Sequence, residues 1–195
     1  KAELAEELYK RAYADEDIKS QKEFKNKVKL DIEKQFINQS DQKFFNDCVE
    51  LLISNTKIEL PEHFVKKLII ANQKEKVNEN DIEKEFSQST KGIKYQLIES
   101  KLIEENNIDI SSDAVKDYAK EMVKKQMAMY GQNKVDDEEL NSIVQRVTSN
   151  KDELKRIYSM LLNEKILNVF KNKMTKKESK LDYKKFIETA YDKNV

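Results

Sequence analysis

Side chains that could perform chemistry are few in this sequence. His63 is the only histidine, and no cysteine or second histidine stands at the spacing that a zinc site requires. We therefore interpret it as a surface or capping residue. The carboxylates Asp136-Asp137-Glu138-Glu139 could hold a hard cation, but the central glycine of a calcium-binding loop is missing. They are better interpreted as the charged start of a helix.

The single cysteine also argues against catalysis. Cys48 lies within the largely apolar segment 44–52, which predicts a small buried residue rather than a reactive thiol. It forms no disulfide within the chain, as is typical of a reducing compartment. No segment resembles a nucleophile elbow or a phosphate-binding loop. We therefore expect no enzyme activity, no cofactor and no metal, and we expect the protein to act by non-covalent binding.

A wide apolar stripe on residues 93–170 is the feature that could bind other molecules. It contains four methionines, whose unbranched, polarisable side chains adapt to partners of different shape. For any single residue the simpler interpretation is the core between antiparallel helices. The stripe as a whole is wider than one neighbouring helix can cover, so part of it should stay exposed, as at interaction sites.

The composition determines the scaffold that must carry this stripe. The 195 residues include only 2 glycines and 1 proline. Antiparallel sheets need glycine, asparagine or aspartate in their turns, and phosphate-binding loops need clustered glycines. We therefore predict an all-α protein. Because only 38% of the residues are apolar and the mean hydropathy is −0.85, we expect long helices in an elongated arrangement with a thin core.

The charges are balanced, with 37 basic and 37 acidic residues. No global field would therefore attract nucleic acid. Residues 171–185 do carry seven lysines against Glu178 and Asp182, which we interpret as a solvated face; nucleic-acid binding there is a weaker alternative. No apolar run approaches the roughly 18 residues of a membrane span, so no membrane partner is expected. No signal peptide is visible, although the sequence begins without methionine and an upstream signal could precede it.

Capping patterns and apolar spacing predict the helices. A capping side chain stands three residues before a glutamate at Ser20, Asn80 and Asn150, and Pro61 and Ser111 mark two further helix starts. The predicted helices span about 2–13, 21–55, 61–76, 81–106, 112–130, 137–148 and 151–173, and residues 180–191 form a short helix or an extended tail. No internal repeat or sustained heptad accompanies them.

Four segments carry a family resemblance. They are, in chain order, ELAEELYK with IKSQKEF (3–10 and 18–24), VELLISNTKIELP (49–61), LIESKLIEENNIDI (97–110) and VFKNKMTKKE (169–178). Together they resemble the C-terminal domain of bacterial trigger factor, a ribosome-associated chaperone, over nearly the whole chain. The connection at 72–82 is shorter than in many members. The family's ribosome-docking and prolyl isomerase modules are absent from this sequence, so neither activity is expected of it.

The resemblance implies a fold and a function. The fold would be an elongated helical body of residues 1–78 and 175–195 with two arm-like projections, residues 79–131 and 136–174. The arms would enclose a crevice for unfolded or nascent polypeptides, which bind without ATP. The ribosome would be contacted only through the missing modules, and the protein would be cytoplasmic.

The apolar stripe falls on these predicted arms, which identifies candidate residues for contact with a client polypeptide. They are Ile93, Leu97, Met122, Met127, Met129, Tyr130, Ile143, Val147, Ile157 and Met160. Two other interpretations stay open: a helical interaction or dimerisation scaffold that recognises one folded partner, and a periplasmic chaperone of similar helical architecture. The sequence leaves client specificity and homodimer formation undecided.

Overall fold

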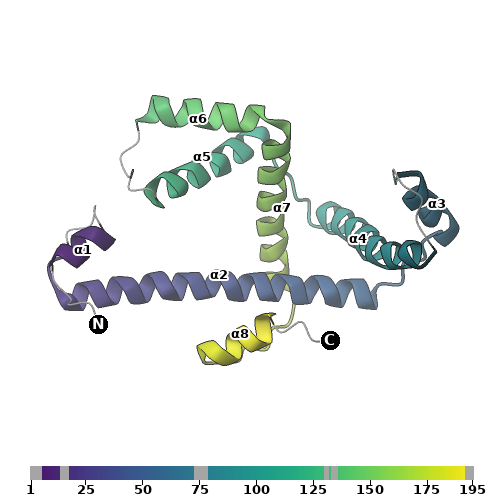
Figure 1. Ribbon diagram of the computed structural model, residues 1–195, viewed down its shortest axis with the longest axis horizontal. Coiled ribbons are helices and arrows are strands. Elements are labelled where there is room, and N and C mark those ends of the chain that lie inside the picture. Colours follow the sequence, from purple (N-terminus) through teal and green to yellow (C-terminus); the bar gives the residue numbers. More distant parts are fainter. Residues whose placement is uncertain (1–5, 14–17, 73–78, 130–131, 133–135, 192–195) are drawn as a thin grey trace. The chain divides into compact units, whose positions relative to one another are not determined.

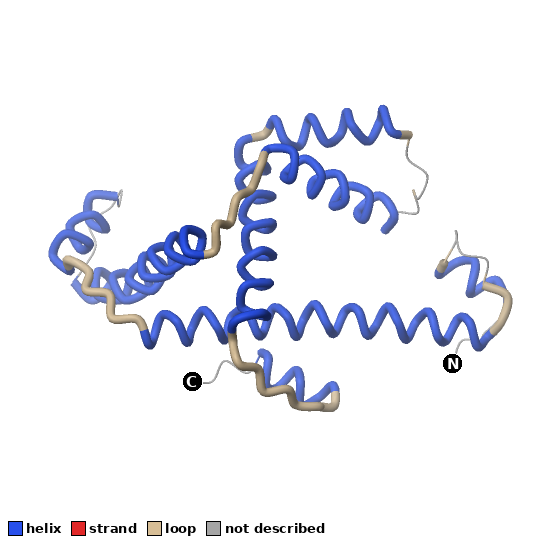
Figure 2. The backbone as a smooth tube through the Cα atoms, turned by 180° about the vertical axis from the view of Figure 1, so that it is seen from behind, coloured by secondary structure: helices blue, strands red, loops and turns tan. Residues whose placement is uncertain are grey.

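The fold of the chain is helical throughout the part that the structure describes. The computed structural model describes residues 6–13, 18–72, 79–129, 132 and 136–191. Within these ranges it contains eight helices and no strand, which confirms the all-α prediction (Figures 1 and 2). The helices are α1 (Glu6–Ala12), α2 (Gln21–Asn55), α3 (Glu62–Asn72), α4 (Glu79–Glu105), α5 (Ser112–Met129), α6 (Asp137–Ser149), α7 (Lys151–Lys173) and α8 (Tyr183–Tyr191).

Side-chain caps explain where α2 and α5 begin. The Ser20 hydroxyl accepts a hydrogen bond from the Glu23 backbone N–H at 3.2 Å, and the Ser111 hydroxyl accepts one from the Ala114 N–H at 3.1 Å. Glu23 in turn accepts from the Lys19 N–H at 2.9 Å, one residue before the donor that a capping box would use. The predicted starts of both helices are therefore confirmed.

Two other helix starts differ slightly from the prediction. Helix α3 begins at Glu62, and the Pro61 carbonyl accepts from the Phe64 and Val65 N–H groups, so Pro61 is the N-cap rather than the first helical residue. Helix α4 begins at Glu79, two residues before the predicted position. At the end of the chain, residues 175–182 are irregular and α8 follows, so the short helix, rather than the extended tail, is present.

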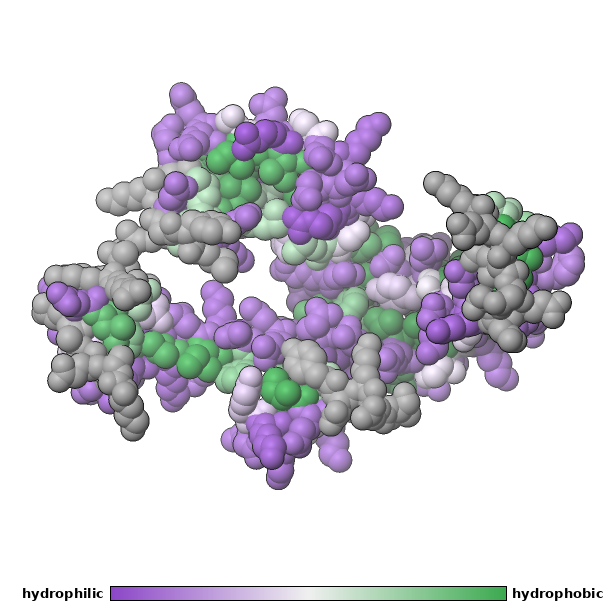
Figure 3. Space-filling model, in the orientation of Figure 1, coloured by the Kyte–Doolittle hydropathy of each residue, from purple (hydrophilic) through white to green (hydrophobic). Residues whose placement is uncertain are grey.

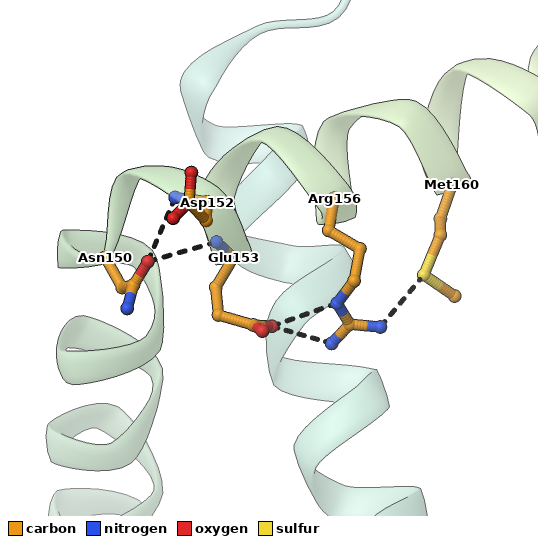
Figure 4. A network of polar contacts seen from close by, with 5 residues as sticks. All are labelled: Asn150, Asp152, Glu153, Arg156 and Met160. Carbon is orange, nitrogen blue, oxygen red and sulfur yellow. Dashed lines mark hydrogen bonds and ion pairs between the residues drawn. The ribbon is translucent and has the colours of Figure 1, made fainter. Parts of the chain in front are cut away.

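The start of α7 carries the third confirmed cap. The Asn150 side-chain oxygen accepts hydrogen bonds from the N–H groups of Asp152, at 2.9 Å, and Glu153, at 3.2 Å (Figure 4). In a capping box the Glu153 carboxylate would accept from a backbone N–H, but here it pairs with Arg156. A charge-assisted bond to a guanidinium is stronger than one to a backbone N–H.

Removal of this cap should have a measurable effect. The variant Asn150→Ala is expected to lower the free energy of unfolding by about 1 kcal/mol, since two backbone N–H groups lose their acceptor. Urea denaturation followed by circular dichroism measures the difference. Asn163→Ala, at an exposed position within α7, is the matched control, and an equal loss in both variants would show that Asn150 does not act as a cap.

The chain forms two compact units. Unit 1 contains the described parts of Lys1–Gln42 and Ile110–Asn168, and unit 2 those of Lys43–Asp109 and Val169–Val195. Helices α2 and α7 each contribute residues to both units. Helix α5 packs against α6 in unit 1, and α3 packs against α4 in unit 2. The predicted body and arms divide the chain at other residues, and that division stays a prediction.

Unit 1 has its core among α5, α6 and α7. The buried residues recur every four positions on α5 and α6, so that each helix presents one apolar stripe to the others. These buried residues are Val115, Ala119, Val123, Leu140, Val144 and Ile157. At the N-terminal end of the unit, the Tyr9 ring stacks on the Phe24 ring at a centroid distance of 4.7 Å, which holds α1 against the start of α2.

In unit 2, Lys66 links α3 to α4. The Lys66 ammonium pairs with the carboxylate of Glu62 at 2.7 Å and with that of Glu83, and it lies 5.0 Å from the centroid of the Phe86 ring.

Cys48 is buried, as predicted, and burial together with the nearby Asp47 raises the pKa of its thiol. The thiol therefore stays protonated near neutral pH, which fits a packing role.

Lys66 should hold α3 in place. Replacing it with alanine removes its ion pairs with both carboxylates and its contact with the Phe86 ring, so backbone amides of α3 are expected to exchange several-fold faster with deuterated solvent. Lys67→Ala is the matched control, because Lys67 is exposed on the same helix. Unchanged exchange in Lys66→Ala would show that the helix pair is held by its apolar contacts alone.

No helix of the described residues is long and apolar enough to cross a membrane.

Candidate functional site

Unit 1 contains an open groove of about 290 Å³ at the meeting of α5, α6 and the start of α7. Its walls are mainly apolar, and three charged or amide side chains lie among them. The lining residues are Met122, Val123, Gln126, Met127, Ile143, Val147, Glu153 and Arg156. We call this site the methionine groove. Apolar surface gathers over α5 and α6 in Figure 3, surrounded by hydrophilic side chains.

The groove is the margin of the stripe that forms the core. Met122 follows the buried Ala119 by three residues and Met127 follows the buried Val123 by four, so each lies beside the core-facing side of α5. On α6, Ile143 and Val147 stand three residues after Leu140 and Val144 in the same way. All four side chains are half-buried and pack against the core cluster. One apolar stripe therefore supplies both the core and an accessible wall.

A charged pair forms one edge of the groove (Figure 4). Arg156 Nε and Nη2 donate to the same carboxylate oxygen of Glu153, at 3.0 and 2.7 Å, and Nη1 lies 3.6 Å from the sulfur of Met160. Both charged side chains are substantially exposed, so the pair contributes little to stability. Its effect is to fix the guanidinium beside an apolar wall.

The structure brings four predicted contact residues together in this groove: Met122, Met127, Ile143 and Val147. Met160 is 38% exposed and does not line the groove, but its sulfur contacts Arg156, which does.

Ile157 has no exposed surface, since it belongs to the unit 1 core. The side chain of Met129 and the whole of Tyr130 lie outside the described residues.

The other two predicted contact residues belong to unit 2. Leu97 is 49% exposed and lines a second groove, of about 430 Å³, whereas Ile93 on the same helix is half-buried and does not line it. We call this site the α4 groove, and its lining residues are Leu52, Thr56, Ile58, Leu97, Ile98, Lys101, Leu102 and Glu105.

Lys101 and Glu105 are the charged residues that line the α4 groove. The Lys101 ammonium donates to Glu104 at 2.8 Å and lies 3.9 Å from Glu105. The bond to Glu104 raises the pKa of Lys101, and the same bond lowers the pKa of Glu104. Both groups are therefore charged at neutral pH, and this groove, like the first, combines an apolar wall with an ion pair.

Sequence reasoning missed several groove residues. Glu153 and Arg156 stand three residues apart on a helix, a spacing that indicates an ion pair, but apolar periodicity does not identify charged residues as contacts. In the α4 groove, Thr56 and Ile58 lie in the connection between α2 and α3, where no helical period could identify them. The only signal in the sequence is the apolar Ile58, shortly before Pro61.

His63 and the acidic residues 136–139 line neither groove. His63 is exposed in the first turn of α3, and residues 136–139 are exposed at the start of α6. Among the residues that the structure describes, no three histidine, cysteine or acidic side chains lie close enough to share a metal ion. Each groove can bind apolar groups, and its ion pair can interact with polar groups next to them.

Comparison with known proteins identifies the family. A family model described as "Probable trigger factor, C-terminal domain" matches residues 40–189, which include both grooves. The comparisons with curated proteins and with solved structures gave no match. The matched domain is a non-catalytic chaperone domain, which implies a chaperone-related function. The chain therefore belongs to the family of trigger factor C-terminal domains.

Proposed function

We propose that this chain binds unfolded or nascent polypeptides through the methionine groove, without ATP. The observation that supports the proposal is the accessible apolar wall of Met122, Met127, Ile143 and Val147 in a member of a chaperone family. Methionine side chains rearrange at low cost, so one groove can accept apolar residues of different shape. This property suits a protein that meets many different unfolded sequences.

The size of the groove limits what it holds. At about 290 Å³ it lies at the lower end of the roughly 300–1,000 Å³ typical of small-molecule pockets. It fits one or two apolar side chains of an extended chain better than a large cofactor. Each side chain that becomes fully buried contributes roughly 1.5–3 kcal/mol before the ordering of the client is subtracted. The groove alone therefore binds with modest affinity and releases its client readily.

The α4 groove supplies a second apolar patch. Leu97 and its neighbours offer the same combination of an apolar wall and an ion pair, on a different unit of the chain. When one client occupies both grooves, the second contact is intramolecular and raises the overall affinity. Long unfolded segments are therefore held more tightly than short ones. Contacts by Ile93, Met129, Tyr130 and Met160 stay predictions within this proposal.

The proposal is tested by binding a client in two states. A labelled protein that stays unfolded in buffer, such as reduced and carboxymethylated α-lactalbumin, is titrated with the chain in the absence of nucleotide, and its folded, disulfide-intact form serves as the control. Fluorescence anisotropy should rise only with the unfolded form and should depend weakly on salt, because the contacts are apolar.

Two outcomes would contradict the proposal. Equal binding to the folded form would favour a scaffold that recognises folded partners. Binding of a polynucleotide that weakens steeply with salt, without binding of the unfolded client, would favour the lysine-rich segment 171–185 as the working surface.

A further inference from the structure

Three methionines of unit 1 are linked to the methionine groove, two as lining residues and one through Arg156. Of the 5 methionines in the sequence, Met122 and Met127 line the methionine groove, and the sulfur of Met160 contacts Arg156, which lines the same groove. Met160 is 38% exposed, and the other two are half-buried. Leucine would provide an equally apolar wall, but only methionine adds a sulfur atom that mild oxidants attack.

We propose that Met122, Met127 and Met160 form a site of reversible oxidation, and that their conversion to methionine sulfoxide closes the groove to apolar clients. This inference rests on the proposed function, since it concerns the regulation of the same groove. Met160 is oxidised first, because it is the most exposed of the three. The half-buried Met122 and Met127 follow.

The chemistry needs one oxidant and one reductant. The sulfur lone pair attacks an oxygen of hydrogen peroxide, an S–O bond forms and the O–O bond breaks. The hydroxyl now bound to sulfur gives its proton to the departing hydroxide, which leaves as water. Sulfur loses two electrons to the peroxide. A methionine sulfoxide reductase reverses the change, because its dithiol is oxidised to a disulfide while the sulfoxide oxygen leaves as water.

The position of Arg156 favours the oxidised form of Met160. Its Nη1 lies 3.6 Å from the Met160 sulfur, and two further bonds to Glu153 fix the guanidinium in that position (Figure 4). A sulfoxide oxygen is a far stronger acceptor than a thioether sulfur. Oxidation therefore replaces a weak N–H···S contact with a charge-assisted N–H···O bond at the same place.

Sulfoxides in the groove should oppose client binding. A client side chain that covers Met122 or Met127 buries an apolar thioether, but after oxidation it would bury a polar sulfoxide that lacks a partner. Burying an unpaired polar group is unfavourable, so the apolar client is expected to bind about tenfold more weakly. Met174, in unit 2 and outside both grooves, should have no such effect.

The experiment compares one protein in three states. The chain is measured untreated, after limited hydrogen peroxide, and after treatment of the oxidised sample with methionine sulfoxide reductases of both stereospecificities. Mass spectrometry counts the sulfoxides, circular dichroism checks the helices, and anisotropy with the unfolded client measures affinity.

Met174→Leu should lose and regain affinity like the natural sequence. Peroxide should leave the affinity of the variant with Met122→Leu, Met127→Leu and Met160→Leu at that variant's own untreated value, which is measured first. Met160→Leu alone should lose a smaller fraction of its own untreated affinity than the natural sequence does.

The outcomes separate the two proposals. If the untreated chain does not bind the unfolded client, the proposed function fails. If it binds, but the affinity is unchanged once all three sulfoxides have formed, the inference of regulation is wrong. The inference is equally wrong if peroxide weakens the variant that lacks Met122, Met127 and Met160 as much as the natural sequence, if Met174 is oxidised while Met160 is not, or if helicity is lost together with affinity.

Discussion

Replacing Ile157 with alanine is expected to lower the free energy of unfolding by about 2–5 kcal/mol, the range for truncating a large aliphatic side chain in a packed core. Ile157 has 0% exposure, and it shares the core with residues of α5 and α6. The atoms that surround Ile157 would lose their packing partners, because truncation leaves a cavity in their place. Urea denaturation, combined with hydrogen exchange at the amides of α5 and α6, measures the loss and shows whether it is confined to unit 1.

Leu154 provides the matched comparison for Ile157. It lies three residues earlier on α7 and is 40% exposed, so Leu154→Ala should cost less than about 1 kcal/mol. A similarly small cost for Ile157→Ala would contradict the packing described for unit 1. It would instead agree with the role in client contact that the sequence predicts for Ile157.

Replacing Met122 and Met127 together by serine is expected to weaken binding of an unfolded polypeptide about tenfold or more. The two changes remove apolar surface that a client would cover and introduce hydroxyl groups that must lose water on binding. Because both side chains are only half-buried, the helices should remain folded. Anisotropy with the unfolded client measures the affinity, and circular dichroism monitors helicity.

Met174→Ser is the control for the double variant. Met174 is also half-buried, but it follows α7 in unit 2 and lines neither groove. Its replacement should leave client affinity unchanged. If the double variant keeps full affinity with intact helices, the methionine groove is not the contact surface, and the α4 groove becomes the candidate to test by replacing Leu97.

The helices could be predicted largely because their signals are local. Ser20, Ser111 and Asn150 each accept hydrogen bonds from N–H groups two or three residues later, so a short segment contains the information that starts the helix. The bounds of α2 and α7 coincide with the predicted ones. The end of α4 is equally local: Asn107 adopts a positive φ of 49°, and the Ile108 N–H donates to the Ile103 carbonyl.

The candidate site could be predicted only in part. Apolar periodicity identifies the stripe, but Ile157 and Met127 both satisfy it, and only the packing of three helices makes one core and the other groove wall. The margin of the stripe depends on how closely α5 approaches α6, which is a tertiary property. The positions of Glu153 and Arg156 at the groove's edge depend on the same packing.

A methyl spectrum of the chain with ¹³C-labelled methionine, recorded during titration with an unfolded polypeptide, shows whether clients bind at the methionine groove. The five methionines give one methyl signal each, assigned by single replacement with leucine. We expect the Met122 and Met127 signals to shift or broaden as the client binds, and the Met174 signal to stay in place. If the client binds while the Met122 and Met127 signals do not respond, the methionine groove is not the binding site.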